Sequence, residues 1–136
     1  MADRFDELLQ SMVDMDYEQL LNGAKRGLTD SYKIFADYSD EDHAVVGVVT
    51  FLAAAVAVDG TFSANEKRLI KDLFGDVDFM ATLRTIGDDD FKAMNSLVDA
   101  LPPEKKAVLC TFATYVLAVD NHINKDEYRY LIDLLD

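Results

Sequence analysis

The chain has little that would cross-link it or insert it into a membrane. Its 136 residues include a single cysteine, Cys110, so no disulfide can form within the chain. The longest apolar run extends from Ala44 to Val58 and stops at Asp59, which is too short for a bilayer span of about 20 residues. The N-terminus is acidic and lacks a signal-peptide profile. These absences predict a cytoplasmic protein without direct membrane insertion.

Basic residues are also scarce. Lys and Arg number 13 against 26 Asp and Glu, which gives a formal net charge of −13. Nucleic-acid binding depends on neutralisation of phosphates by a basic face, and anionic lipid surfaces attract basic segments. The charge therefore predicts no nucleic-acid binding and no direct binding to anionic lipid. Its natural partners are a basic or membrane-associated protein and divalent cations.

The motifs that carry catalysis or nucleotide binding are missing as well. The chain has no Glu-x-x-His of a di-iron bundle, no His-Glu-x-x-His zinc helix and no glycine-rich phosphate loop. Cys110 lies in an apolar segment, which is typical of a small buried side chain. Its only possible bases are His43 and His122. We therefore predict that the protein is not an enzyme.

What the sequence does contain is one stretch that occurs twice. An apolar segment, an acidic turn and a second amphipathic segment occupy residues 51–74 and recur over residues 112–135. Both turns read Asp-(Gly/Asn)-x-(Phe/Ile)-(Ser/Asn)-x-x-Glu. A long period with matched chemistry at the turn indicates a duplicated helix hairpin.

The residues of each turn suit the end of one helix and the start of the next. Gly60 and Asn121 tolerate the left-handed conformation that helix ends commonly use. Ser63 and Asn124 are predicted N-caps, and the motif glutamate three residues later completes a capping box in each copy.

The two aspartates of the repeat are the unusual feature. Asp59 and Asp120 are predicted to end a helix, where the macrodipole disfavours a carboxylate by about 0.3–1 kcal/mol at an exposed site. Two interpretations are open. The aspartates can cap their own turns by accepting hydrogen bonds from backbone N–H groups. Alternatively, a divalent cation can be held within one hairpin or between both hairpins across a pseudo-twofold axis, by Asp59, Glu66, Asp120 and Glu127.

Helical periodicity dominates, and no alternating strand pattern occurs. We expect one all-α domain over residues 1–136, with about seven helices and the duplicated hairpin in pseudo-twofold symmetry around two buried helices. The expected parts are N-terminal helices in residues 1–38, a first hairpin in residues 40–74, connecting helices in residues 76–101 and a second hairpin in residues 103–135.

Several helix boundaries can be predicted from single residues. Ser39 is expected to cap the first helix of hairpin one, and Gly75 to end the second. Asp76 or Asp78 is expected to begin a short helix. Helices are also expected to begin at the aspartates of residues 88–90 and at Pro103.

Two further expectations concern packing. The apolar segments Ala44–Val58 and Ala107–Val119 are expected to be buried helices that pack on each other, the first because it is apolar on all sides. Gly23 and Gly27 lie four residues apart on an N-terminal helix. They either allow another helix to approach closely or weaken their own helix; the sequence leaves both readings open.

The repeated motif resembles that of the TerB-like family, which is named for a tellurite-resistance protein. The resemblance is carried by residues 54–66, Ala-Ala-Val-Ala-Val-Asp-Gly-Thr-Phe-Ser-Ala-Asn-Glu. It is repeated in residues 117–127, Leu-Ala-Val-Asp-Asn-His-Ile-Asn-Lys-Asp-Glu. It extends over residues 40–136, and the N-terminal helices match less clearly.

This resemblance implies an all-α domain of roughly seven helices with two-fold pseudo-symmetry and no enzymatic activity. The family is associated with bacterial stress responses, including the response to tellurite. Its repeated acidic residues, proposed to bind metal ions, correspond here to Asp59, Glu66, Asp120 and Glu127. The first functional hypothesis is a stress-response module that binds a divalent cation and docks on a protein partner. The second is a purely structural protein–protein interaction domain whose acidic turns are helix caps.

Overall fold

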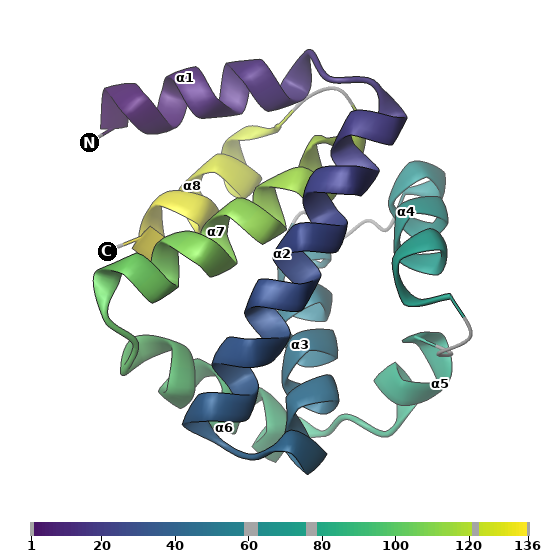
Figure 1. Cartoon of the computed structure of the whole chain (residues 1–136), viewed down its shortest axis with the longest axis vertical. Coiled ribbons are helices and arrows are strands. Elements are labelled where there is room, and N and C mark those ends of the chain that lie inside the picture. Colours follow the sequence, from purple (N-terminus) through teal and green to yellow (C-terminus); the bar gives the residue numbers. More distant parts are fainter. Residues whose placement is uncertain (1, 59–62, 76–78, 121–122, 136) are drawn as a thin grey trace.

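The computed structural model describes residues 2–58, 63–75, 79–120 and 123–135, except for the side chains of residues 2–5, 42 and 80. Over these ranges the chain is all-α, as the sequence predicts (Figure 1). It forms eight α-helices and one 3-10 helix: α1 (Ala2–Val13), α2 (Tyr17–Tyr38), α3 (Glu41–Val56), α4 (Ala64–Phe74), α5 (Phe79–Arg84), α6 (Asp88–Asp99), α7 (Pro103–Leu117), η1 (Ala118–Asp120) and α8 (Lys125–Leu135).

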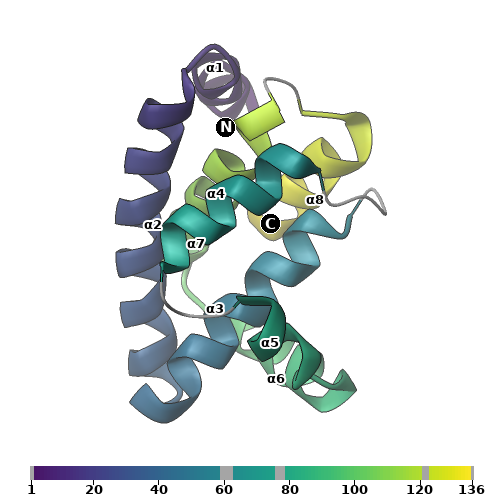
Figure 2. The same ribbon diagram turned by 90° about the vertical axis from the view of Figure 1, so that its right-hand side faces the viewer.

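The longest helix, α2, runs along the molecule and packs against both α3 and α7 (Figures 1 and 2). Its two central glycines make the contact with α7 possible. A Cβ atom at Gly23 would overlap the ring of Tyr115, and one at Gly27 would lie 2.8 Å from Cδ1 of Phe112. Gly23 and Gly27 therefore allow close helix approach, which decides between the two readings of these glycines.

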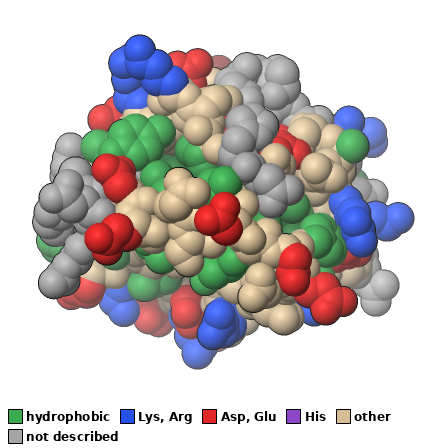
Figure 3. All heavy atoms as spheres, turned by 90° about the horizontal axis from the view of Figure 1, so that it is seen from above, with side chains coloured by type: hydrophobic (Ala, Val, Ile, Leu, Met, Phe, Trp, Pro, Cys, Tyr) green, Lys and Arg blue, Asp and Glu red, His purple; other side chains and the backbone are tan. Residues whose placement is uncertain are grey.

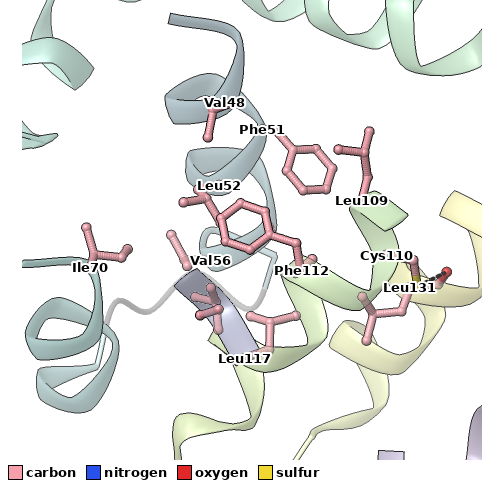
Figure 4. Close-up of a cluster of buried hydrophobic side chains, with 14 of the residues drawn as sticks. Val48, Phe51, Leu52, Val56, Ile70, Leu109, Cys110, Phe112, Leu117 and Leu131 are labelled. Atoms are coloured by element: carbon pink, nitrogen blue, oxygen red, sulfur yellow. Dashed lines mark hydrogen bonds between the residues drawn. The ribbon is translucent and has the colours of Figure 1, made fainter. Parts of the chain in front are cut away.

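The two apolar segments form α3 and α7, and most of their side chains are buried, as expected. Figure 4 shows Phe51 and Leu52 of α3 next to Phe112 of α7 in the core. The two helices contact each other, yet each has more extensive contact with α2. The core is therefore organised around three helices rather than around the expected pair.

One predicted helix start is wrong. Asp40, and not Ser39, is the N-cap of α3, and its Oδ1 atom accepts a hydrogen bond from the backbone N–H of His43 at 2.8 Å. Ser39 ends α2 instead, with its backbone N–H donating to the carbonyl oxygen of Phe35 at 2.9 Å. Serine and aspartate are about equally good N-caps, so the pattern did not distinguish two neighbouring candidates.

Other boundaries agree with the sequence. Gly75 ends α4 with a φ of 56°, the left-handed conformation that favours glycine. Pro103 is the first residue of α7, and Asp88 the first of α6. The start predicted at Asp76 or Asp78 lies outside the described residues.

The first copy of the repeat forms α3 and α4, and the second forms α7, η1 and α8 (Figure 2). Among the described residues α7 packs against α8, whereas α4 packs mainly against α2, η1 and α7 rather than against α3. The first helix of each copy ends earlier than predicted, at Val56 and at Leu117. In the second copy the chain then tightens into 3-10 geometry as far as Asp120, as helix ends commonly do. Asp59, the matching residue of the first copy, lies outside the described residues.

In the part of the chain that the structure describes, no helix combines the length and the apolar character that crossing a membrane requires.

Candidate functional site

The candidate site lies where the N-terminal end of α4 meets η1. We call residues 63–66 the first elbow, and residues 118–120 together with residues 123–127 the second elbow. In the first elbow the N–H of Ser63 donates to Oε1 of Glu66 at 2.9 Å, and the N–H of Glu66 donates to Oγ of Ser63 at 3.0 Å. In the second, Asn124 and Glu127 form the equivalent pair of bonds at 3.1 and 2.8 Å. Both predicted capping boxes are confirmed.

The second elbow is bonded directly to the first. Oδ1 of Asp120 accepts a hydrogen bond from Oγ of Ser63 at 3.1 Å and another from Nδ2 of Asn65 at 3.0 Å. The Asp120 carboxylate therefore lies at the N-terminal end of α4, where the helix dipole and unsatisfied donors favour negative charge. The favourable interaction of the Asp120 carboxylate with the N-terminal end of α4 offsets its unfavourable interaction with the negative C-terminal end of the preceding helix.

Sequence reasoning missed this contact. Ser63 was expected to serve only its own capping box, and Asn65 was given no role. The available signal was that the first copy has Asn65 where the second has Asp126. An amide can donate a hydrogen bond to Asp120, whereas a carboxylate cannot.

Glu66 is the most unusual side chain of the site. It is only 3% exposed, and Glu127 is only 7% exposed. Oε1 of Glu66 accepts the bond from Ser63, but its Oε2 atom is buried and has no hydrogen-bond partner among the described residues. Burial raises the pKa of the Glu66 carboxyl above its ordinary value; the bonds from Ser63 oppose this, and the charges of Asp120 and Glu127 add to it.

The structure thus brings together three of the four carboxylates predicted to bind a metal, Glu66, Asp120 and Glu127. Asp59, the fourth, lies outside the described residues. Within the described ranges, no group of three or more His, Cys, Asp or Glu side chains has an arrangement that could hold a metal ion. Binding of a cation by these residues therefore stays a prediction.

The remaining candidates for a reactive side chain are Cys110 and the two histidines. Burial raises the pKa of the Cys110 thiol to about 12, and its Sγ atom lies 3.7 Å from the carbonyl oxygen of Leu131 (Figure 4). Nδ1 of His43 lies 2.7 Å from Oδ1 of the N-cap Asp40, and this His43 ring is largely exposed. His122 lies outside the described residues.

Comparison of the chain with models of known protein families, with curated proteins and with solved structures finds no match. The resemblance to the TerB-like family therefore stays a prediction from the repeated motif.

Proposed function

We propose that this protein is a non-enzymatic module whose paired elbows bind a divalent cation and which docks on a protein partner. The observation that carries the proposal is the buried Glu66 carboxyl, whose Oε2 atom lacks a hydrogen-bond partner in the described structure. Leaving a buried polar group unpaired costs about 1–3 kcal/mol, and more if it is charged. A cation beside Glu66 would offset this cost and the repulsion from Asp120 and Glu127.

The donor set indicates which ions suit the site. Glu66, Asp120 and Glu127 supply carboxylate oxygens, and the sequence adds Asp59 as a fourth ligand. Oxygen ligands suit calcium, magnesium and manganese, whereas sulfur and imidazole ligands favour zinc and copper. We therefore expect calcium, magnesium or manganese to bind more tightly than zinc.

The remaining parts of the proposal have separate support. The high pKa of the buried Cys110 thiol supports a non-enzymatic role, because the thiolate is the nucleophilic form. The repeated motif, through its resemblance to TerB-like proteins, supports a place in a bacterial stress response such as that to tellurite. The charge of −13 supports a basic protein as partner. Figure 3 shows carboxylates among apolar side chains over the middle of one face, with Lys and Arg near its edges.

The proposal can be tested by calorimetric titration of chelator-treated protein with calcium, magnesium, manganese and zinc. We expect binding heat and a raised melting temperature with at least one ion. Glu66→Gln is expected to abolish both effects, whereas Glu104→Gln, at an exposed position in the first turn of α7, is expected to leave them unchanged. Absence of heat and an unchanged melting temperature with all four ions would refute cation binding.

A second candidate function is a purely structural interaction domain. It is favoured by the bonds from Ser63 and Asn65 to Asp120, which give that carboxylate a role without a cation. On this reading Asp59→Asn and Asp120→Asn would barely change stability, with or without metal ions. Loss of a stress phenotype in a folded Glu66→Gln protein would instead support the cation site.

A further inference from the structure

An apolar groove lies between α2, α3 and α4, at the ends of α3 and α4 that are opposite to the first elbow. Figure 2 shows the arrangement of these three helices, whose side chains line the groove. The groove has a volume of about 310 Å³ and is open to solvent. Its apolar lining comes from Leu28 and Tyr32 of α2, Val45 and Val48 of α3, and Leu73 and Phe74 of α4.

The rim of the groove exposes large apolar side chains. Tyr32 is 37% exposed and Val45 is 40% exposed, whereas Val48 is fully buried at the bottom of the groove. The sequence predicted that α3 is buried on all sides, and Val45 is an exception to that prediction. The apolar side chains of an open groove are accessible to the apolar face of a partner helix.

The charges around the groove differ from those of the whole chain. Thr29 of α2 also lines the groove. Lys25 lies one helical turn before Thr29 and Lys33 one turn after it, so the three residues share one face of α2. Lys71 lies three residues before Phe74 on α4. All three lysines are exposed, and among the described residues none of them is within salt-bridge distance of a carboxylate.

The wall formed by α3 has the opposite charge, because the exposed Glu41 lies one turn before Val45. The groove therefore has Lys25, Lys33 and Lys71 along α2 and α4, with the exposed Asp37 one turn beyond Lys33, and Glu41 near α3. A ligand that fills it must be apolar at the centre and negatively charged on the side facing α2.

We propose that this groove docks an amphipathic helix of a protein partner, with apolar residues spaced i, i+3, i+4 and i+7 and with Asp or Glu facing Lys25 and Lys33. Helices commonly bind apolar grooves through such anchors, and complementary charge at the rim selects among them. The small volume and open shape suit the side chains of a partner helix. The net charge of the whole chain favours basic partners. The partner helix at this groove is nevertheless expected to be acidic, because Lys25, Lys33 and Lys71 lie beside the groove.

Nuclear magnetic resonance of the isotope-labelled full chain, recorded with chelator present, can test the proposal. The probes are two synthetic helical peptides with identical apolar residues, one flanked by Glu and the other by Lys. We expect the Glu peptide to shift the amide signals around Thr29, Val45 and Phe74 in a saturable way. We also expect it to bind about tenfold more tightly than the Lys peptide, a difference of about 1.4 kcal/mol.

Variants locate the binding. Val45→Glu puts a charge on the apolar rim and is expected to weaken binding of the Glu peptide at least about tenfold. Leu8→Glu, at a residue of α1 that is 38% exposed, is the matched control and is expected to change nothing. Reversing the charge of Lys25 and Lys33 together should exchange the preference between the two peptides, whereas Lys92→Glu on α6 should not.

Circular dichroism establishes that each variant is folded, and the exposed lysine variants keep the test valid if Val45→Glu unfolds. The proposal is overturned if neither peptide binds, if both bind equally, or if the shifted signals lie elsewhere. It is also overturned if a folded Val45→Glu protein, or the double lysine variant, binds as the unmodified chain does. Because the experiment excludes metal ions, its outcome is independent of cation binding at the elbows.

Discussion

Asp120 in the second elbow is hydrogen-bonded to Ser63 in the first, with 3.1 Å between Oδ1 of Asp120 and Oγ of Ser63. The same oxygen accepts a bond from Asn65. One carboxylate oxygen therefore joins η1 to the N-terminus of α4, and so connects the two copies of the repeat. Since Glu66 shares Ser63 as a bonding partner, its environment depends on the position of the second elbow.

Asp120→Ala removes both bonds between the elbows. We expect the free energy of unfolding to fall by about 1–3 kcal/mol, because hydrogen bonds to charged groups are stronger than neutral ones. Urea denaturation measures the change, with Asp99→Ala at an exposed site on α6 as the control. If the two variants lose equally little stability, the contact does not stabilise the fold.

Glu66→Gln is expected to change how stability depends on pH. The pKa of the Glu66 carboxyl is raised, so the stability it contributes is fully present below its ordinary pKa of 4.5 and is lost as pH rises through the higher folded pKa. The glutamine variant does not titrate there. In chelator, its melting temperature relative to the unmodified protein should therefore rise between acid and neutral pH. A constant difference over that range would contradict the raised pKa.

Tyr17 joins the start of α2 to α4, since its hydroxyl donates to Oδ2 of Asp72 and the guanidinium carbon of Arg68 lies 4.0 Å from its ring centroid. Tyr17→Phe is expected to lower the free energy of unfolding by about 0.5–1.5 kcal/mol at neutral pH. Tyr38→Phe, at a residue that is 46% exposed, is the control and should be nearly silent.

The stability difference caused by Tyr17→Phe is also expected to depend on pH in the alkaline range. Burial, followed by the hydrogen bond to Asp72 and its charge, raises the pKa of Tyr17 from 10.0 to about 12, although Arg68 opposes this. A raised pKa means that the stabilisation is complete below 10.0 and disappears as pH rises through about 12. The stability difference between the unmodified protein and Tyr17→Phe should therefore shrink over this interval in denaturant titrations. A difference that persists above it would show that the phenol proton is not involved.

Gly23→Ala tests the close contact between α2 and α7. Alanine favours helix by about 1 kcal/mol over glycine, but its Cβ would overlap the Tyr115 ring. We expect a net loss of about 1–3 kcal/mol of unfolding free energy, as for other overpacked cores. Gly87→Ala is the control, because a Cβ there meets nothing within 4 Å. A stabilised Gly23→Ala protein would show that the ring moves aside at little cost.

Local features of the fold follow from neighbouring residues and could be predicted. The Ser63–Glu66 and Asn124–Glu127 boxes depend on groups three residues apart. The end of α4 at Gly75 depends on the conformational freedom of one glycine, and the start of α7 at Pro103 on the fixed φ and missing N–H of one proline. Where two neighbours had equal capping ability, at Ser39 and Asp40, the prediction chose the wrong one.

The sequence by itself determined the helices, the repeated order of an apolar helix and an amphipathic helix, and the capping boxes, because capping and periodicity act over a few residues. Only the tertiary structure decided that α2 packs against both α3 and α7, that Asp120 bonds to Ser63, and that Val45 remains exposed. These relationships join residues far apart in the chain. They depend on how helix surfaces of particular shape, with Gly23 and Gly27 among them, fit together, and a local pattern carries no information about that fit.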